Sequence, residues 1–307
     1  MTLVITTCTN RKRKPVADAL RMSALPEADL EGLAQQWSHR LTSEQTRFRG
    51  EDIYGGRGFR EAVAAAELLD AKLLVVSAGL GLIEVSTVVP PYACTVLVDA
   101  PDSVRSRVTG AFSAADWWAA ICKASPFAVA VHDAVEYGRG TICAALSDAY
   151  IEMIAADVLA LPPSVLGRLR LFTRASLNRV PLELQPFVMP YDDRLDGPDS
   201  PHRGTRSDFA GRALRHFAEL TRGNPPERSA AEDSEAVAAA LQGWRMPARI
   251  DRVRHDDTTM LDLIRADWDA VGGSSSRLLR HFRDNLGIAC EQGRFAALAR
   301  RVRSERA

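Results

Sequence analysis

The sequence lacks paired cysteines, long apolar runs and an excess of charge of either sign. It contains five cysteines: Cys8, Cys94, Cys122, Cys143 and Cys290. Because their number is odd and no two have the spacing of a metal-binding pair, we expect neither a disulfide framework nor a zinc site. The apolar stretch at the start is too short for a membrane span, and it precedes the charged residues, which is the reverse of a signal peptide. These absences favour a cytoplasmic protein without membrane contact.

The charges balance in number but not in position. The chain has 307 residues, of which 46% are hydrophobic, and its 39 basic residues equal its 39 acidic ones. That composition is typical of a folded protein with one large and one small domain. Basic residues nevertheless cluster at 11–14 and at 277–306, where eight arginines stand against three acidic residues. Both clusters are candidates for contact with phosphate.

Apolar runs alternate with helical patterns over the first two thirds of the chain. Runs typical of buried strands occur at 3–7, 73–76, 127–131 and 169–172, with a weaker one at 187–189. Helical periodicity covers 30–48, 58–69, 114–123, 147–159 and 208–220. This alternation predicts an α/β fold with a mostly parallel sheet and helices on both faces.

The composition changes after Arg222, where a polar stretch with two prolines interrupts the helical pattern. We predict an α/β domain at 1–222, a linker at 223–231 and a small helical domain at 232–307. Helices in the small domain are predicted at 232–241, 258–271, 274–286 and 292–302. Gly272 and Gly273 join the middle two, and the helix at 274–286 carries Arg277 and Arg280 opposite its apolar residues. This pattern is typical of a DNA-binding helix-turn-helix, although a solvated arginine face has the same pattern.

Residues at strand ends are the first candidates for a site, because the crevice beyond the carboxyl ends of strands binds ligands in α/β sheets. The run 73–76 is followed by Ser77, Gly79 and Gly81, and then by a proline-rich loop that contains Tyr92. The first strand is followed by Cys8, Thr9, Asn10, Arg11 and Lys12.

Each of these side chains has two interpretations. The amide of Asn10 suits either the edge of a nucleobase or the cap of a turn. Tyr92 suits either stacking on a base or the core. Cys8 is in no recognisable register with a histidine, so a buried inert thiol is the simpler interpretation than a nucleophile.

Other residues suit phosphate or hydrolysis. Tyr54 is followed by Gly55, Gly56, Arg57 and Gly58 at the start of a predicted helix, where backbone N–H groups attract anions. This turn lacks the lysine and hydroxyl residues of a nucleoside-triphosphate loop. Arg203 and Arg206 precede a further helix, which Asp208 is expected to cap.

Two carboxylates are the candidates for hydrolysis of a bond between a sugar and a base, which requires a group that orients water. Glu84 follows the glycine-rich turn, and Asp133 follows the run 127–131. We predict both at the crevice, although for each carboxylate taken singly a surface or capping role is the simpler interpretation.

Three stretches together resemble the YaaA-like superfamily: LVITTCTNRKR, YGGRGFREA, and VVSAGLGLI followed by PPY. Members of that superfamily carry a cysteine-serine-lysine stretch after the first strand, a tyrosine before the next helix, and a serine- and glycine-containing turn followed by proline and tyrosine. The motifs carry over to these residues, which would line a shared pocket: Cys8, Thr9, Asn10, Tyr54, Ser77, Gly79, Gly81 and Tyr92. The chain has Thr9 and Asn10 where serine and lysine are usual, and it lacks the Gln-Asp-Pro-Tyr-His loop of uracil-DNA glycosylases.

The resemblance implies a fold related to uracil-DNA glycosylases and an association with DNA. Our hypothesis is an anti-phage DNA glycosylase that flips a modified base, such as glucosylated hydroxymethylcytosine, out of the duplex and hydrolyses its N-glycosidic bond. Asn10 would read the base, Tyr54 or Tyr92 would stack on it, and Glu84 or Asp133 would act in hydrolysis without a metal or organic cofactor. Phosphates would be held by Arg11, Lys12, Arg57, Arg203, Arg206, Arg277 and Arg280.

Three alternatives stay open. One is a protein that binds or protects DNA without chemistry, and another is a hydrolase of free nucleosides or deazapurines. A transcriptional regulator with a ligand-sensing α/β domain is a weaker third. Deletion of the C-terminal domain would separate activity on DNA from activity on small molecules.

Overall fold

The computed structural model describes residues 1–136, 138–223, 228–248 and 252–306. The chain divides into two compact units, Met1–Pro247 and Ala248–Ala307. Each unit has a hydrophobic core of its own.

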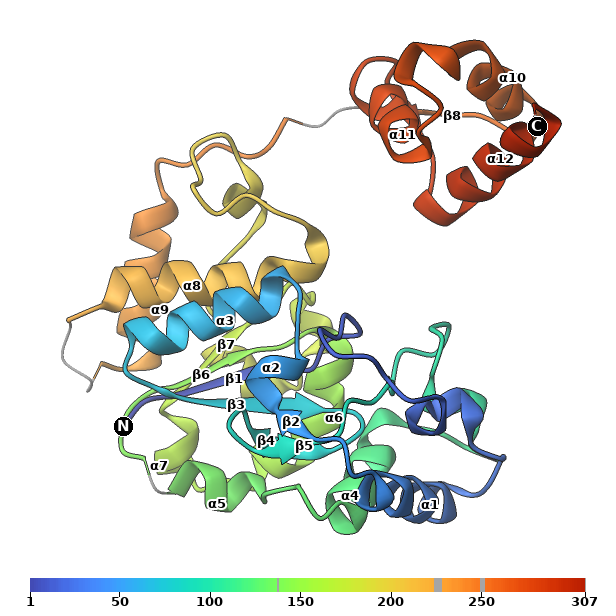
Figure 1. Ribbon diagram of the computed structural model, residues 1–307. Helices are drawn as coiled ribbons and strands as arrows, with labels where there is room; N and C mark the ends of the chain where they lie inside the picture. Colours follow the sequence, from blue (N-terminus) through green and yellow to red (C-terminus); the bar gives the residue numbers. More distant parts are fainter. Residues whose placement is uncertain (137, 224–227, 249–251, 307) are drawn as a thin grey trace. The chain divides into compact units, whose positions relative to one another are not determined.

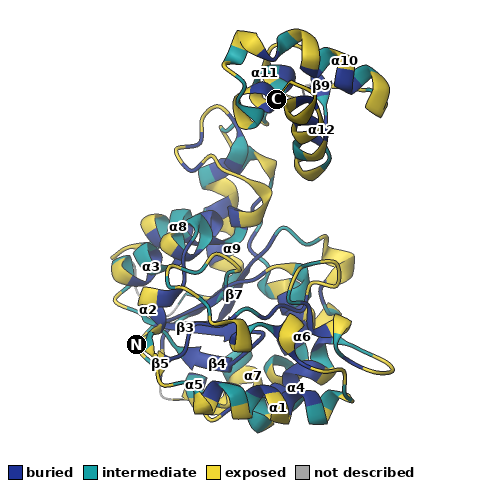
Figure 2. Cartoon of the chain, turned by 45° about the vertical axis from the view of Figure 1, so that its right-hand side comes forward, coloured by how far each residue is buried: buried dark blue, intermediate teal, exposed yellow. Residues whose placement is uncertain are grey.

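A five-stranded sheet forms the centre of the first unit (Figure 1). Its strands are β1 (Leu3–Thr7), β3 (Lys72–Ser77), β4 (Gly81–Glu84), β6 (Ile142–Ala145) and β7 (Leu169–Phe172). They lie in the order β4-β3-β1-β6-β7, and only β4 is antiparallel to its neighbour. Nearly every residue of these strands is buried, as Figure 2 shows for β3 and β4. Continuous apolar runs of this kind are expected when both faces of a parallel sheet are covered.

Helices cover both faces of the sheet, as predicted. On one face, α3 (Arg57–Leu68) and α8 (Phe209–Thr221) pack against each other and against the central strands. On the other face lie α1 (Leu30–Ser43), α4 (Ala114–Ala124) and α6 (Asp148–Leu159). The first unit is therefore an α/β fold, and its long helices lie within a few residues of their predicted ranges except at the end of α1.

Shorter elements complete the first unit. They are β2 (Phe48–Arg49), β5 (Val88–Val89), α2 (Gly50–Ile53), α5 (Val131–Glu136), α7 (Pro163–Leu166) and α9 (Ala230–Leu241). Short 3₁₀ helices occur at Asp18–Leu20, Met22–Ala24, Val104–Ser106, Leu177–Arg179, Leu182–Phe187, Asp193–Asp196 and Arg206–Asp208. None of the helices in the described parts of the chain has the length and apolar composition needed to cross a membrane.

Two of the predicted strands are wrong. The run 127–131 is a loop that leads into α5, and the N–H of Val129 bonds to the carbonyl of Leu82 at 2.8 Å. The run 187–189 contributes only an isolated bridge between Val188 and Leu171. In their places the sheet contains β4 and β6, which the sequence pattern did not predict.

The boundary between the units lies later than predicted, because α9 belongs to the first unit. Val237 and Leu241 are fully buried in the first core. Asp233 forms an ion pair with Arg170 of β7, with 2.6 Å between Oδ2 and Nε. The predicted linker 223–231 therefore precedes a helix of the same unit, and its residues 224–227 lie outside the described residues.

The second unit is built from three helices, as the sequence predicted for this region. These are α10 (Asp257–Asp267), α11 (Ser275–Asp284) and α12 (Gln292–Glu305), and the 3₁₀ turn Asp269–Val271 follows α10. Gly272 has φ +66°, a conformation that favours glycine, and Ser274 caps α11. Two short strands, β8 (Val253–Arg254) and β9 (Ile288–Ala289), pair in parallel. The predicted pair of helices joined by a glycine turn is thus confirmed, and its contact with DNA stays a prediction.

Candidate functional site

A cleft of about 690 Å³ lies at the carboxyl ends of β1, β6 and β7. The chain continues from β1 to β3 on one side and places β6 on the other, so the strand order changes direction between β1 and β6. Ligands of open α/β sheets bind at this switch point. The cleft is lined by 6–11, 55–59, 145–148, 174–176 and 206–208, and by Thr95, Leu97, Tyr150, Arg179, Ala210 and Gly211.

The segment after β1 supplies one wall of the cleft, as predicted for Cys8, Thr9, Asn10 and Arg11. The Cys8 Sγ lies 3.1 Å from the Tyr150 hydroxyl, and both residues are nearly buried. Asn10 and Arg11 are exposed, so their polar groups face solvent in the cleft. Cys8 therefore belongs to the packed floor, whereas Asn10 and Arg11 are accessible to a ligand.

Five arginines line the cleft, and they make it strongly basic. They are Arg11, Arg57, Arg174, Arg179 and Arg206. Three of them form ion pairs at the rim: Arg57 with Glu61 at 3.1 Å, Arg174 with Asp193 at 2.6 Å and Arg179 with Asp148 at 3.0 Å. Arg11 and Arg206 pair with no carboxylate in the described parts of the chain. Such a surface attracts anions, and guanidinium groups suit phosphate in particular.

Helix N-termini add to this positive potential. α3 starts at Arg57 within the cleft, and its N-cap residue Gly56 has no side chain to satisfy the first N–H groups. α6 starts at Asp148, also in the cleft, and the Ser147 side chain does not bond to it as a cap. Unpaired N–H groups at the start of a helix favour a bound anion. Gly55, Gly56, Arg57 and Gly58 of the turn at 54–58 therefore line the cleft, and their contact with phosphate stays a prediction.

Two carboxylates line the cleft, and they differ in exposure and in the number of hydrogen bonds that they accept. Asp148 is partly exposed and contacts Arg179 through one oxygen. Asp208 is buried and accepts hydrogen bonds from the Thr205 backbone, the Thr205 hydroxyl and the Arg212 guanidinium. Burial alone would raise the pKa of Asp208, but these bonds lower it below its ordinary value. Asp208 is therefore held in the capping box of the 3₁₀ turn Arg206–Asp208, and its side chain does not cap α8 as predicted. Asp148 is the more exposed carboxylate of the cleft.

Glu84 is not in the cleft, which corrects its predicted catalytic role. Gly81, at φ +80°, turns the chain back so that β4 runs antiparallel to β3. Glu84 is consequently opposite Leu74 and forms an ion pair with Lys72, the first residue of β3. It lies toward the amino end of the sheet, away from the cleft at the carboxyl ends.

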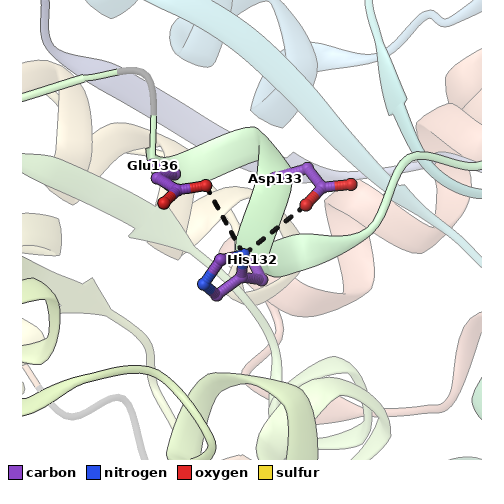
Figure 3. Close-up of side chains that lie close together, drawn as sticks. All are labelled: His132, Asp133 and Glu136. Atoms are coloured by element: carbon purple, nitrogen blue, oxygen red, sulfur yellow. Dashed lines mark hydrogen bonds and ion pairs between the residues drawn. The ribbon is translucent and has the colours of Figure 1, made fainter.

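Asp133 is also misplaced for catalysis, because no strand precedes it. It lies exposed on α5 beside His132 and Glu136 (Figure 3). The His132 Nδ1 is 3.5 Å from the Asp133 carboxylate and 3.7 Å from the Glu136 carboxylate. Arg168, just before β7, bonds to the Val135 carbonyl, so α5 lies near the amino ends of the strands. Among the described residues this is the one group of three side chains close enough to share a metal ion, and all three are exposed.

The predicted pocket residues Tyr54, Ser77, Gly79, Gly81 and Tyr92 are buried and do not line the cleft. The Tyr54 and Tyr92 hydroxyls are 3.0 Å apart, and Tyr92 also bonds to Ser77. Burial raises the pKa of both tyrosines. A Cβ on Gly79 would come within 2.7 Å of the Tyr92 ring, so the turn packs tightly against it. In this structure neither tyrosine can stack on a base.

Lys12 lies inside this tyrosine cluster, which corrects its predicted contact with phosphate. Its Nζ is 5.1 Å from the ring centre of Tyr54 and 4.5 Å from that of Tyr92, and it donates to the Thr9 carbonyl. Burial lowers the pKa of Lys12 because it disfavours the charged form. A lysine thus occupies this region, although Asn10 stands where the resembled superfamily has one.

The remaining predicted phosphate ligands differ in position. Arg206 lines the cleft, whereas Arg203 is exposed outside its wall and donates to the Pro198 carbonyl. Arg277 and Arg280 are exposed on α11 of the second unit. The sequence analysis missed Asp148, Arg174 and Arg179, because β6 was not recognised and the loop after β7 carried no motif.

No protein-family model, curated protein or solved structure matches this chain. The resemblance to the YaaA-like superfamily therefore stays a prediction.

Proposed function

We propose that the cleft binds a nucleotide of a DNA strand and that the protein hydrolyses the N-glycosidic bond of a base flipped into it. The observation that carries the proposal is the cleft itself, which combines five arginines with the partly exposed carboxylate of Asp148 at the switch point of the sheet. The arginines suit the phosphates on either side of the flipped nucleotide. The α/β sheet is compatible with the DNA-glycosylase-like fold that the resemblance implies.

Asp148 takes the role first assigned to Glu84 and Asp133. Its partly exposed carboxylate stabilises the positive charge that develops on the sugar and orients a water molecule toward C1′. The water oxygen bonds to C1′ as the bond to the base breaks, and the base leaves with the bonding electrons and a proton. Asn10, exposed in the lining of the cleft, reads the edge of the base. The substrate class remains a modified base, such as glucosylated hydroxymethylcytosine in phage DNA.

One observation favours a second candidate, a protein that binds DNA without chemistry. Both carboxylates of the cleft are paired with arginines, Asp148 with Arg179 and Asp208 with Arg212. If Arg179 holds Asp148 throughout binding, no group in the cleft activates water. The glycosylase releases a base from DNA, whereas the binding protein does not.

The deciding experiment incubates the purified protein with plain DNA, uracil-containing DNA, glucosylated-hydroxymethylcytosine DNA and free nucleosides. Released bases are measured by mass spectrometry and abasic sites by alkaline cleavage. We expect base release from one DNA substrate, reduced at least a hundredfold by Asp148→Asn, since positioned charge typically contributes about 10²–10³ in rate.

Asp133→Asn is the matched control, because it makes the same chemical change at an exposed site outside the cleft. It should leave base release unchanged. Salt-sensitive DNA binding with no release from any substrate would replace the glycosylase proposal by the binding protein. Release from free nucleosides alone would replace it by a nucleoside hydrolase.

A further inference from the structure

The second unit has a basic groove. The groove has a volume of about 490 Å³ and is lined by four arginines: Arg252, Arg254, Arg283 and Arg294. The rest of its wall is Ala289, Cys290 and Glu291. Four guanidinium groups around one carboxylate form a site for anions.

The backbone brings these arginines together from three segments, β8 with the residues before it, α11 and α12. β8 and β9 pair so that Arg254 is opposite Ala289 in the groove wall. Side chains two residues apart in extended chain point to the same side, so Arg252 and Arg254 project together. Arg283 comes from the last turn of α11, and Arg294 from the first turn of α12.

Backbone carbonyls position three of the guanidinium groups. Arg283 donates to the Cys290 carbonyl at 2.8 Å, Arg294 to the His255 carbonyl at 2.9 Å and Arg252 to the Arg283 carbonyl at 3.0 Å. A guanidinium has five N–H donors, so each of the three retains donors beyond these bonds. Arg254 forms no hydrogen bond or ion pair through its side chain within 252–306 or the other described ranges.

Glu291 offsets only part of the positive charge of the groove, because its single carboxylate faces four guanidinium groups. Its two oxygens accept hydrogen bonds from the backbone N–H groups of Gly293 and Arg294, both at 2.7 Å. These bonds cap α12 and lower the pKa of Glu291. Asp257 pairs with Arg294, and Asp284 lies 3.7 Å from Arg252. The groove therefore keeps an excess of positive charge.

The basic surface continues along α11. Arg277, Arg280 and Arg283 recur at three-residue intervals, which places successive arginines side by side on the helix. Arg277 and Arg280 are exposed, and their side chains pair with no acidic residue that the structure describes. A row of charges that extends beyond the groove matches a polymer with repeating negative charges better than a single small anion.

We propose that Arg252, Arg254, Arg283 and Arg294 form a binding site for the phosphate backbone of duplex DNA. The row on α11 then extends this site, instead of being the whole DNA-binding surface. The proposal rests on the proposed function for the identity of the polyanion. It adds a surface of the second unit that binds DNA through its phosphates. Contacts to phosphate alone carry no base specificity, so this site binds independently of sequence.

The test measures binding of the full-length protein to a fluorescein-labelled duplex with only unmodified bases, by fluorescence anisotropy at several salt concentrations. Arg254→Gln should weaken binding several-fold and lower the slope of log K against log salt by about 0.9, because one phosphate fewer is neutralised. The double variant Arg252→Gln/Arg254→Gln should lower the slope by roughly twice as much. Because Arg254 is exposed and makes no internal bond, its replacement should leave the circular dichroism spectrum and the Tm unchanged.

Arg300→Gln is the control, since Arg300 is an exposed arginine of α12 outside the groove wall. It should bind like the wild type. Wild-type affinity and slope in both groove variants, or no DNA binding by the wild type, would overturn the proposal. Loss of binding in Arg277→Gln/Arg280→Gln with unchanged groove variants would assign DNA to α11 instead. The duplex contains no target base, so failure of base release would refute the proposed chemistry without affecting this result.

Discussion

Single residues after β1 divide into those that face the cleft and those that support it. Asn10 and Arg11 are exposed in the cleft wall, whereas Lys12 is turned toward the buried rings of Tyr54 and Tyr92. The sequence could not separate them, because a run of basic residues looks uniformly solvated until the fold places one beside an apolar cluster. Lys12 is therefore the residue whose environment differs most from its expected one.

The lowered pKa of Lys12 predicts a pH dependence of stability. Between its folded pKa and the unfolded value of 10.5, the unfolded chain binds more protons than the folded one, so this group adds stability as pH rises. The Lys12→Met variant lacks this pH-dependent contribution to stability, because methionine does not bind a proton. We expect the difference in free energy of unfolding, wild type minus variant, to increase from pH 7 to pH 9.5 in urea titrations.

Arg13→Met is the control for this series, because it makes a similar change at an exposed basic residue of the same segment. Its difference from the wild type should not change with pH. A difference that is equally constant for Lys12→Met would show that the ammonium is solvated in the folded protein.

At the scale of elements, Asp233 attaches α9 to the rest of the first unit through ion pairs with Arg170 at 2.6 Å and Arg228 at 3.0 Å. Arg170 and Asp233 expose only 1% and 4% of their side chains. The other donors of Arg170 reach the carbonyls of Gly167, Leu169 and Arg228. Loss of the carboxylate charge leaves a buried guanidinium without its counter-ion, which typically costs about 3–5 kcal/mol.

Asp233→Asn should therefore lower the free energy of unfolding by about 3–5 kcal/mol in urea titrations. Asp193→Asn is the matched control, because it makes the same change in the half-exposed pair with Arg174 and should cost less than about 1 kcal/mol. Equal effects of the two substitutions would mean that α9 is held by its apolar residues Val237 and Leu241 and not by the pair.

The elements also show what the sequence could predict. Long amphipathic helices such as α3 and α8 have many residues that repeat one pattern, so their ranges were predicted closely. β6 consists of Ile142, Cys143 and two alanines, a run too small in side-chain volume to resemble a strand. The run 127–131 does resemble a strand, yet it forms no strand. Apolar residues can be buried in the core without forming the hydrogen bonds of a sheet. The assignment of Asp133 failed for this reason, whereas that of Glu84 failed because the turn at Gly81 leads into the unpredicted antiparallel strand β4.

At the scale of the whole molecule, the boundary between the two units, after Pro247, predicts which truncated chain folds. A chain that ends at Pro247 keeps α9 and the complete first core, whereas one that ends at Arg222 loses Asp233, Val237 and Leu241. We expect residues 1–247 to unfold cooperatively, as a compact domain with its own core does, and residues 1–222 to be strongly destabilised or insoluble. Thermal unfolding followed by circular dichroism distinguishes the two, and similar melting of both would place α9 outside the cooperative unit.

The same truncation separates the two activities that the proposed function combines. Residues 1–247 contain every residue that lines the cleft, and they lack the four arginines of the groove. If the cleft carries the chemistry and the second unit holds DNA, the truncated protein should release bases from a short oligonucleotide at saturating concentration as the full chain does. On long duplex DNA below saturation it should be slower, and its rate should depend less steeply on salt, because it neutralises fewer phosphates. Equal salt dependence in the two proteins would mean that the cleft alone determines DNA binding.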